Sequence, residues 1–237
     1  MSSLKTLIFF ATPEHPCSYL EGRQATTMFV DPRANVDKAL YSQLTELGFR
    51  RSGSHYYRPQ CRGCNACIPV RIPVEDFRPD RSQRRVRQAN QDLNLAVTPV
   101  RFDEEIYDLY ERYINERHQD GDMYPASREQ FTSFLIDGTI DGFYLEMRDN
   151  ENRLLGVAVV DVLNNGLSAI YTMFEPGEEK RSLGTYAILW QIEEAQRRHL
   201  PHLYLGYWIR QCRKMNYKTR FKPLQQMVQG YWVDLIC

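Results

Sequence analysis

The sequence predicts an α+β fold in which an N-terminal cysteine-bearing α/β domain (residues 1–99) is followed by a second domain (residues 100–237). Three observations predict it. The chain of 237 residues, 43% of them hydrophobic and 25% charged, has the size and composition of a globular protein. Helical and strand periodicities alternate in its first half. In its second half, beyond a boundary near Pro99, two helical segments precede three consecutive strand patterns.

The first half contains two predicted helices and two predicted strands. Residues 36–48 carry apolar side chains at helical spacing and end at Gly48, a common helix stop. Strands are expected at residues 54–57 and 70–74, on either side of a cysteine-rich loop. The arginine-rich stretch that follows predicts a helix over residues 82–93.

The second half opens with two helices whose first residues are capping side chains. Asp103 is expected to cap a helix over residues 103–117, and Ser127, with Gln130 at capping-box spacing, begins another. Three strands follow, with Asn164-Asn165-Gly166 as the tight turn between the last two. They span residues 143–147, 154–162 and 167–174.

The C-terminal part adds a long helix at residues 183–198, a strand at 203–206, a short basic helical segment and a last strand at 231–235. Two helices, three strands, helix, strand, helix, strand is the element order of the N-acetyltransferase fold. The order therefore predicts a GNAT-like second domain, and by analogy of fold it favours acyl transfer.

The segment before the long helix argues against coenzyme A as the acyl donor. Enzymes that use acetyl-CoA wrap its pyrophosphate with a glycine-rich loop here, because backbone amides must approach the phosphates. Residues 178–186 contain one glycine, Gly184, together with the bulky Tyr186 and two acids, Glu178 and Glu179. We therefore expect another donor, and a CoA-dependent N-acetyltransferase remains an alternative.

Charge is balanced over the whole chain but clustered locally. Thirty basic and thirty acidic residues cancel, so nucleic-acid binding would need local patches. Residues 78–87 contain five arginines and one acid, Asp80. A second run holds six cations and no acid: Arg210, Arg213, Lys214, Lys218, Arg220 and Lys222. Each run is either a nucleic-acid contact or a solvated surface.

Three cysteines have C-x-x-C-x-x-C spacing at positions 61, 64 and 67. Cys61, Cys64 and Cys67, with Cys17 upstream, could hold zinc or an iron–sulfur cluster. The alternative is a set of reduced thiols that orient the loop. Apolar residues 7–11 form too short a run for a membrane span, so we expect a cytoplasmic protein that binds neither membrane nor DNA.

Motifs spread over nearly the whole chain resemble those of the N-end-rule aminoacyl-tRNA–protein transferases, in particular the bacterial aspartate/glutamate leucyltransferases. In the first half the motifs are at residues 15–20, 48–53, 57–59, 61–67 (CRGCNAC), 69–72 and 82–85. In the second half they are at residues 168–171, 174–176, 205–209 (LGYWI), 212, 214–215 and 217–218. Their order and spacing together make the resemblance specific.

The resemblance implies transfer of leucine from leucyl-tRNA to proteins whose first residue is Asp or Glu, which creates a signal for degradation. Arginyl-transferases share several of these motifs, so arginyl transfer is the first alternative. A third possibility is a non-catalytic, metal-stabilised tRNA-binding module, which would leave the acyltransferase-like half unexplained.

The chemistry of such a transfer suggests candidate catalytic residues. The acceptor α-amine has a pKa of about 7.7–8.0 in model peptides, so positioning and oxyanion stabilisation should matter more than a strong base, and no cofactor is required. Asp161 and Tyr171, on the central strands, and Tyr207, after the next one, are the candidates. Each could instead be a structural residue of the core or the sheet.

Binding of the two substrates calls for cations. An arginine can grip the acidic N-terminal side chain with two parallel hydrogen bonds, and Arg71 is the first candidate, followed by Arg50 and Arg51. Phosphates of the tRNA acceptor stem would meet the basic runs. The candidates for this contact are Arg81, Arg84, Arg85, Arg87, Lys214 and Lys218.

Overall fold

A computed structural model describes residues 4–236; residues 1–3 and 237, at the outer ends of the two predicted domains, lie outside it. Its helices are α1 (Lys38–Glu46), α2 (Arg81–Ala89), α3 (Glu104–Arg117), α4 (Arg128–Phe131) and α5 (Leu183–Arg197). Shorter helical turns are η1 (Leu4–Thr6), η2 (Thr132–Ile136, a π-helix), η3 (Pro176–Arg181) and η4 (Arg213–Arg220). No helix in this part of the chain is long and apolar enough to cross a membrane.

Eight strands form the central sheet, in the order β14-β13-β7-β12-β11-β10-β9-β8. They are β7 (Ile68–Pro73), β8 (Asn94–Pro99), β9 (Gly142–Arg148), β10 (Leu154–Leu163), β11 (Gly166–Phe174), β12 (His202–Trp208), β13 (Gln225–Val228) and β14 (Tyr231–Asp234). The α+β class is thus confirmed. Strands β7 and β8 precede the boundary expected near Pro99, so both halves of the sequence build this sheet.

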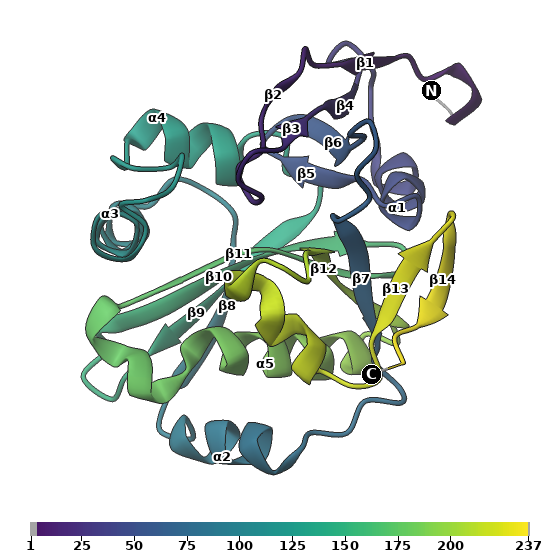
Figure 1. Cartoon of the computed structure of the whole chain (residues 1–237). Coiled ribbons are helices and arrows are strands. Elements are labelled where there is room, and N and C mark those ends of the chain that lie inside the picture. The colour runs from purple at the N-terminus through teal and green to yellow at the C-terminus, as the bar shows by residue number, and fades with distance from the viewer. Residues whose placement is uncertain (1–3, 237) are drawn as a thin grey trace.

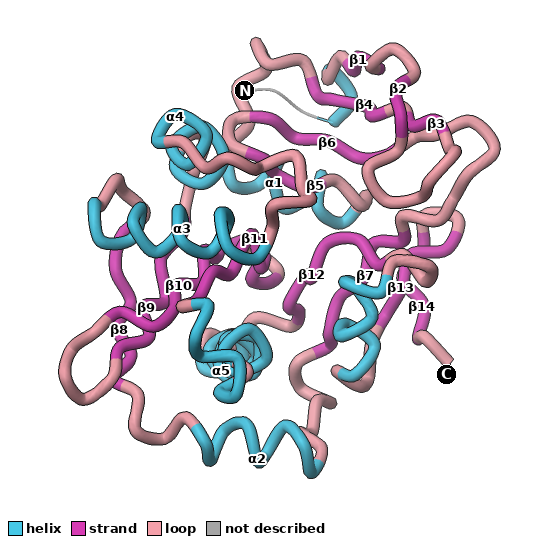
Figure 2. Tube along the Cα trace, turned by 60° about the vertical axis from the view of Figure 1, so that its left-hand side comes forward, coloured by secondary structure: helices cyan, strands magenta, loops and turns pink. Residues whose placement is uncertain are grey.

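Helices cover both faces of the central sheet (Figures 1 and 2). Helices α3 and α4 pack on one face, through residues such as Tyr110 and Phe131, while α5 packs on the other. Helix α2 lies outside α5. Because β10 is covered on both faces, all ten of its residues are buried, as in the interior strands of layered α/β proteins.

A smaller four-stranded sheet, in the order β1-β4-β6-β5, stands beside α1 at the N-terminal end (Figure 1). Its strands are β1 (Phe9–Ala11), β4 (Thr27–Val30), β5 (Arg50–Ser52) and β6 (His55–Pro59), and β2 (His15–Pro16) pairs separately with β3 (Gln24–Ala25). Besides the hydrophobic cores on the two faces of the central sheet, a third core joins this region to that sheet. It includes Leu44, Tyr56, Leu163 and Tyr204.

Most long elements match the sequence predictions. Asp103 caps α3 by accepting hydrogen bonds from Glu105 and Ile106, and Ser127 caps α4 by accepting one from Gln130. The predicted helix over residues 82–93 ends early, at Ala89. Strands β1–β5, β8 and β13 were not predicted, because they are mostly two to four residues long and, in β8, mostly exposed, so no apolar alternation marks them.

A buried ion pair ties the small sheet to the central one. Arg51 of β5 donates to both carboxylate oxygens of Asp161 on β10, over 2.6 and 2.9 Å, and both side chains are at most 1% exposed. The Tyr41 hydroxyl of α1 donates to the same carboxylate over 2.8 Å. Arg51 also donates to the main-chain oxygens of Gly53 and Asp137, so its charge is fully enclosed by acceptors.

Replacing Asp161 by Asn should destabilise the protein by about 3–5 kcal/mol, because Arg51 would stay buried without a counter-charge. Urea unfolding followed by circular dichroism measures the change. Asp141→Asn is the matched control, since it breaks a half-exposed pair with Lys38 and should cost about 1 kcal/mol or less. Equal losses in the two variants would contradict a dominant role for the buried pair.

Candidate active site

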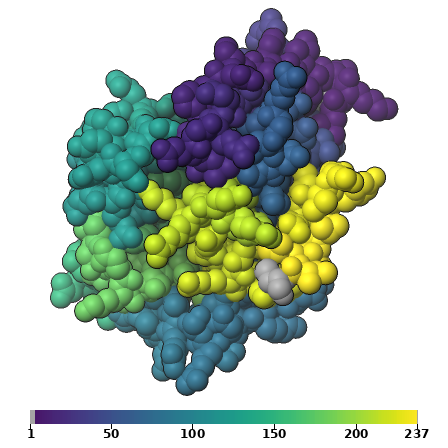
Figure 3. Space-filling model, viewed as in Figure 1, coloured from purple at the N-terminus to yellow at the C-terminus, as the bar shows by residue number. Residues whose placement is uncertain are grey.

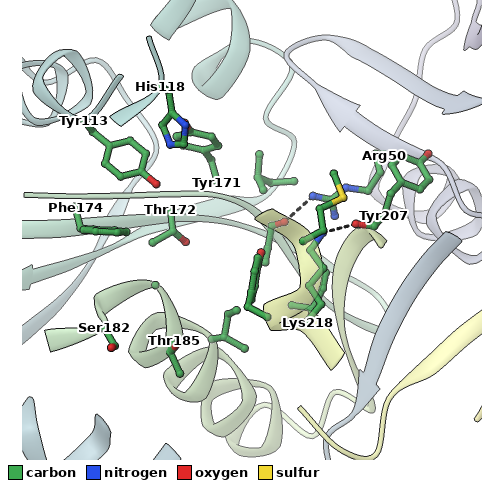
Figure 4. Close-up of a pocket in the computed structure, with 18 of the residues that line it drawn as sticks. Arg50, Tyr113, His118, Tyr171, Thr172, Phe174, Ser182, Thr185, Tyr207 and Lys218 are labelled. Carbon is green, nitrogen blue, oxygen red and sulfur yellow. Dashed lines mark hydrogen bonds between the residues drawn. The ribbon is translucent and has the colours of Figure 1, made fainter. Parts of the chain in front are cut away.

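A cavity of 530 Å³ lies where β11 and β12 separate (Figure 4). The two strands pair in parallel only between Gly166–Ser168 and His202–Tyr204, and beyond this β12 continues alongside β7. Register shifts mark both strands at this point and leave Ile170 of β11 and Leu205 of β12 unpaired, and both residues line the cavity. Such bulges redirect a strand. The divergence of β11 from β12 therefore creates the cavity.

The cavity has two distinct ends. Figure 4 shows Arg50, Tyr207 and Lys218 together at one end, and Tyr113, His118 and Phe174 at the other. Apolar side chains line the space as well, among them Ile170, Ile188, Leu205 and Met215. Among the described residues that line it there is no Asp or Glu, so its fixed charges are positive.

Arg50 is held in place by its neighbours on β11 and β12. Its guanidinium donates to the Ser168 hydroxyl over 2.9 Å and to the Ala169 carbonyl over 2.6 Å. It lies against Gly206, where an added Cβ would come within 2.9 Å of the Arg50 Nε and where φ is +73°. Gly206 is thus required both by its backbone conformation and by the approach of Arg50.

Lys218 is a buried amine, only 7% exposed, at the same end of the cavity. Its Nζ donates a hydrogen bond to the main-chain oxygen of Tyr207. Burial, followed by the nearby Arg50 charge, lowers the pKa of Lys218 to about 7. A large fraction of this amine is therefore neutral at physiological pH.

Tyrosines dominate the remaining polar surface. Burial raises the pKa of Tyr217 to about 12 and raises the pKa of Tyr171 and Tyr207 further, so all three phenols stay protonated. The Tyr207 hydroxyl donates to the main-chain oxygens of Gly48, over 2.8 Å, and Tyr57, over 3.2 Å. Burial also lowers the pKa of His118, so its imidazole is neutral at pH 7.

The structure separates the residues expected to act in catalysis and acceptor binding. Tyr171, Tyr207 and Arg50 line the cavity, whereas Asp161 and Arg51 form the buried ion pair outside it. Arg71 lies on β7, where it donates to Glu46 over 2.8 Å and to Gln225 over 2.9 Å and stacks 4.4 Å from the Trp232 ring. Asp161, Arg51 and Arg71 thus connect secondary-structure elements.

The residues expected to contact tRNA also differ in their surroundings. Arg81, Arg84 and Arg85 are exposed on α2, while Arg87 pairs with Glu193 of α5. Lys214 is exposed and pairs with Asp120 over 2.7 Å, whereas Lys218 is buried. The two basic runs meet, because the Gln83 side chain of α2 donates to the Arg220 main-chain oxygen and Phe77 packs against Phe221.

The four cysteines line a second cavity, of 300 Å³, beside Tyr207. The Cys61 sulfur exchanges hydrogen bonds with the Thr26 backbone, and burial followed by the other thiols raises the pKa of Cys67 to about 12. Within residues 4–236, no group of three Cys, His, Asp or Glu side chains is arranged to hold a metal ion. The zinc or iron–sulfur site expected at these four cysteines therefore stays a prediction.

The segment that leads into α5 is fixed by charged side chains. Arg181 of η3 pairs with Asp92 and Glu178, and Glu178 pairs with Arg153. These acids are therefore neutralised within the protein, in a turn held by side chains, whereas a glycine-rich phosphate loop would leave its amides open.

Several cavity residues were not predicted, notably Tyr19, Tyr113, His118 and Thr172. They come from elements far apart in the sequence, and nothing in their local pattern distinguishes them from core or surface residues. Gly206 did carry a signal, because an isolated glycine inside a strand indicates a bulge or a close approach of another group.

Comparisons with solved structures give low similarity. L-PGS from Bacillus licheniformis has a TM-score of 0.45 and 8% identity, over 60% of this chain and 46% of that one. The glucosamine N-acetyltransferase region of a fungal β-N-acetylglucosaminidase has a TM-score of 0.46 and 10% identity, over 79% of this chain and 21% of that one.

Sequence comparisons are specific. The models for the N terminus and the C terminus of the arginine-tRNA-protein transferases match residues 15–85 and 105–228. Aspartate/glutamate leucyltransferases from Marinobacter nauticus, Hahella chejuensis and Pseudomonas fluorescens are 65%, 55% and 54% identical to this chain. The matches span 99% of this chain and 99–100% of the relatives. The chain therefore belongs to the arginine-tRNA-protein transferase family and is an aminoacyltransferase.

Proposed function

We propose that this protein transfers leucine from leucyl-tRNA to the N-terminal Asp or Glu of acceptor proteins, and that the reaction takes place in the cavity between β11 and β12. The names of the full-length relatives support the reaction, and the position of the cavity in the sheet supports the site. The product would carry an N-terminal leucine that marks it for degradation. Since charged tRNA is a cytoplasmic substrate, we assign the enzyme to the cytoplasm.

The absence of acidic residues among the described side chains of the cavity is the observation that favours leucine over arginine. An arginyl group would bring a guanidinium next to Arg50 and Lys218 without a carboxylate to pair with it, and an unpaired cation in a partly desolvated site is costly. A leucyl side chain can instead pack against Ile170, Ile188 and Leu205.

The same positive charge suits an acidic acceptor. Arg50 is fixed by Ser168 and Ala169 in an orientation that leaves further N–H groups for a ligand, since a guanidinium has five donors. A carboxylate from an N-terminal Asp or Glu can accept two of them side by side. Arg50 therefore replaces Arg71 as the leading candidate for acceptor recognition, because Arg71 is already paired with Glu46.

Positioning and hydrogen bonding account for the remaining chemistry. The attack of the amine on the leucyl ester creates a tetrahedral oxyanion, and each preorganised donor contributes about 2.7–4 kcal/mol to its stabilisation. Tyr171 lines the cavity and keeps its proton, so we assign it as a donor. Tyr207, whose hydroxyl binds two main-chain oxygens, positions the wall between the two cavities.

The basic surface, which we define as Arg81, Arg84, Arg85, Arg210, Arg213, Arg220 and Lys222, is the proposed tRNA contact. All seven side chains are exposed. Segment 213–220, which carries Met215 and Lys218 into the cavity, faces the viewer in Figure 3. A tRNA held there by phosphate contacts would have its 3′ end close to the cavity.

Purified enzyme should transfer labelled leucine, and not arginine, from charged tRNA to peptides that begin with Asp or Glu. Peptides that begin with Ala or Lys serve as controls, because neither provides a carboxylate for Arg50. Transfer of arginine would identify the protein as an arginyl-transferase. Binding of tRNA without any transfer would favour a non-catalytic tRNA-binding module. Product formed with acetyl-CoA alone would instead favour an N-acetyltransferase.

Arg50→Lys should lower kcat/KM for an Asp peptide about 10–100-fold, because a bidentate charged hydrogen bond is lost. Transfer to the matched Asn peptide should fall much less, so the preference for Asp over Asn narrows. Steady-state kinetics with the two peptides measure this ratio, and Arg33→Lys, on an exposed side chain that does not line the cavity, is the control. An equal loss for both peptides would contradict carboxylate recognition by Arg50.

Arg85→Gln and Arg213→Gln should each weaken leucyl-tRNA binding and reduce the dependence of log K on log salt by about one unit per lost phosphate contact. Filter binding between 50 and 200 mM salt, roughly the range over which such contacts dominate, measures both effects. Arg33→Gln should change neither. An unchanged salt slope in both variants would remove the basic surface from the proposal.

A further inference from the structure

Lys218 differs from the other cations of its sequence run. Arg210, Arg213, Lys214, Arg220 and Lys222 are exposed, whereas Lys218 turns inward and lines the cavity (Figure 4). A solvated basic helix has no reason to bury one lysine, because removing an ammonium group from water is costly. The buried position therefore calls for an explanation other than contact with the surface of a nucleic acid.

The groups around the Lys218 amine do not neutralise its charge. Arg50 of β5 is a second cation at this end of the cavity, and the phenol of Tyr217, whose ring centre lies 5.9 Å from Nζ, is neutral. Tyr207 of β12 offers its main-chain oxygen, and Cys212 directly precedes segment 213–220, which carries Lys218. Among the described residues, none forms an ion pair with Lys218.

We propose that Lys218 is the catalytic base of the transfer reaction and accepts the proton that the acceptor α-ammonium must lose before its nitrogen can attack the leucyl ester. This proposal rests on the leucyl transfer proposed above. Lys218 and Arg50 lie at the same end of the cavity, and an N-terminal Asp carries its α-amine two carbon atoms from its carboxylate carbon. One acceptor residue can therefore present its carboxylate to Arg50 and its amine to Lys218.

The protons balance over the reaction. Neutral Lys218 takes one proton from the α-ammonium, and the freed amine forms a bond to the ester carbonyl carbon. The bond from that carbon to the ribose oxygen then breaks, and the Lys218 ammonium returns its proton to this oxygen. The second proton of the nitrogen is released to solvent, so that one ester bond is broken, one peptide bond is formed and Lys218 is restored.

The depressed pKa suits this role. A base works best when its pKa is near the operating pH, and the acceptor amine itself titrates at about 7.7–8.0 in model peptides. Since the pKa of Lys218 is about 7, its neutral form accumulates as the pH rises through 7. Neutral Lys218 is therefore available as a base at about pH 7, where most acceptor amines are still protonated.

The test uses single-turnover transfer from bound leucyl-tRNA to an Asp peptide between pH 6 and 9, with Lys218→Arg and Lys218→Gln. Both variants keep a donor for the Tyr207 oxygen, but neither can take up a proton. Each should be about 100-fold slower at pH 7. The deficit should shrink toward pH 9, where the acceptor amine is neutral without help. Lys180→Arg, on an exposed lysine outside the site, is the matched control.

Two results would overturn the proposal while leucyl transfer by the wild type stood. One is a normal rate in Lys218→Gln, which would mean that only the hydrogen bond to Tyr207 matters. The other is a deficit of the same size at every pH, which would indicate misplacement of substrate. Absence of leucyl transfer by the wild type would instead refute the proposed function itself.

A measurement on the wild type covers the case in which the variants do not fold. Competitive labelling of lysine amines over pH 5–11, read residue by residue by mass spectrometry, gives the pKa of Lys218 beside that of Lys180. A pKa of about 7 for Lys218, well below the ordinary lysine value, is expected. An ordinary lysine value would overturn the assignment of Lys218 as a base at neutral pH.

Discussion

The pairing of Arg51 with Asp161 is the interaction on which the geometry of the cavity depends. Successive residues of a strand point to opposite faces, so Arg51 and Arg50 of β5 cannot point the same way. Once Arg51 is enclosed against β10, Arg50 is directed toward β11 and β12, where it reaches Ser168 and Ala169. The Arg51–Asp161 ion pair lies outside the cavity, yet it determines where Arg50 lies within it.

The cavity forms because β12 cannot stay paired with both of its neighbours, β11 and β7, along its whole length. This strand pairs in parallel with β11 for three residues and in antiparallel with β7 for its whole length. It cannot follow β7 to its end and still stay beside β11. The open space that results is lined by the first turn of α5 on one side and by segment 213–220 on the other. Sheet, helix and basic segment therefore meet at the cavity proposed to bring donor and acceptor together.

Sequence patterns were sufficient for the long elements, because caps such as Asp103 and the buried strand β10 are determined by nearby residues. They were less informative about the site. Asp161 stood out as a carboxylate in an apolar strand, but its partner Arg51 lies 110 positions away and is invisible to any local pattern. Lys218 looked like its exposed neighbours, since burial of one side chain in a basic run is decided by the packing of the segment against β12 and β5. Arg71 was the first candidate for acceptor binding, ahead of Arg50, because no local pattern revealed that Arg71 is paired with Glu46.

The place of β7 in the central sheet has a consequence for biosynthesis. This strand lies between β12 and β13, both of which are translated more than 120 residues later. At about 5–20 residues per second, β7 spends on the order of 10 s on the ribosome with both of its edges unpaired. Unpaired strand edges invite association with other chains. The N-terminal half should therefore depend on chaperones during synthesis more than its size alone suggests, and the enzyme can become active only after its last strands have left the exit tunnel.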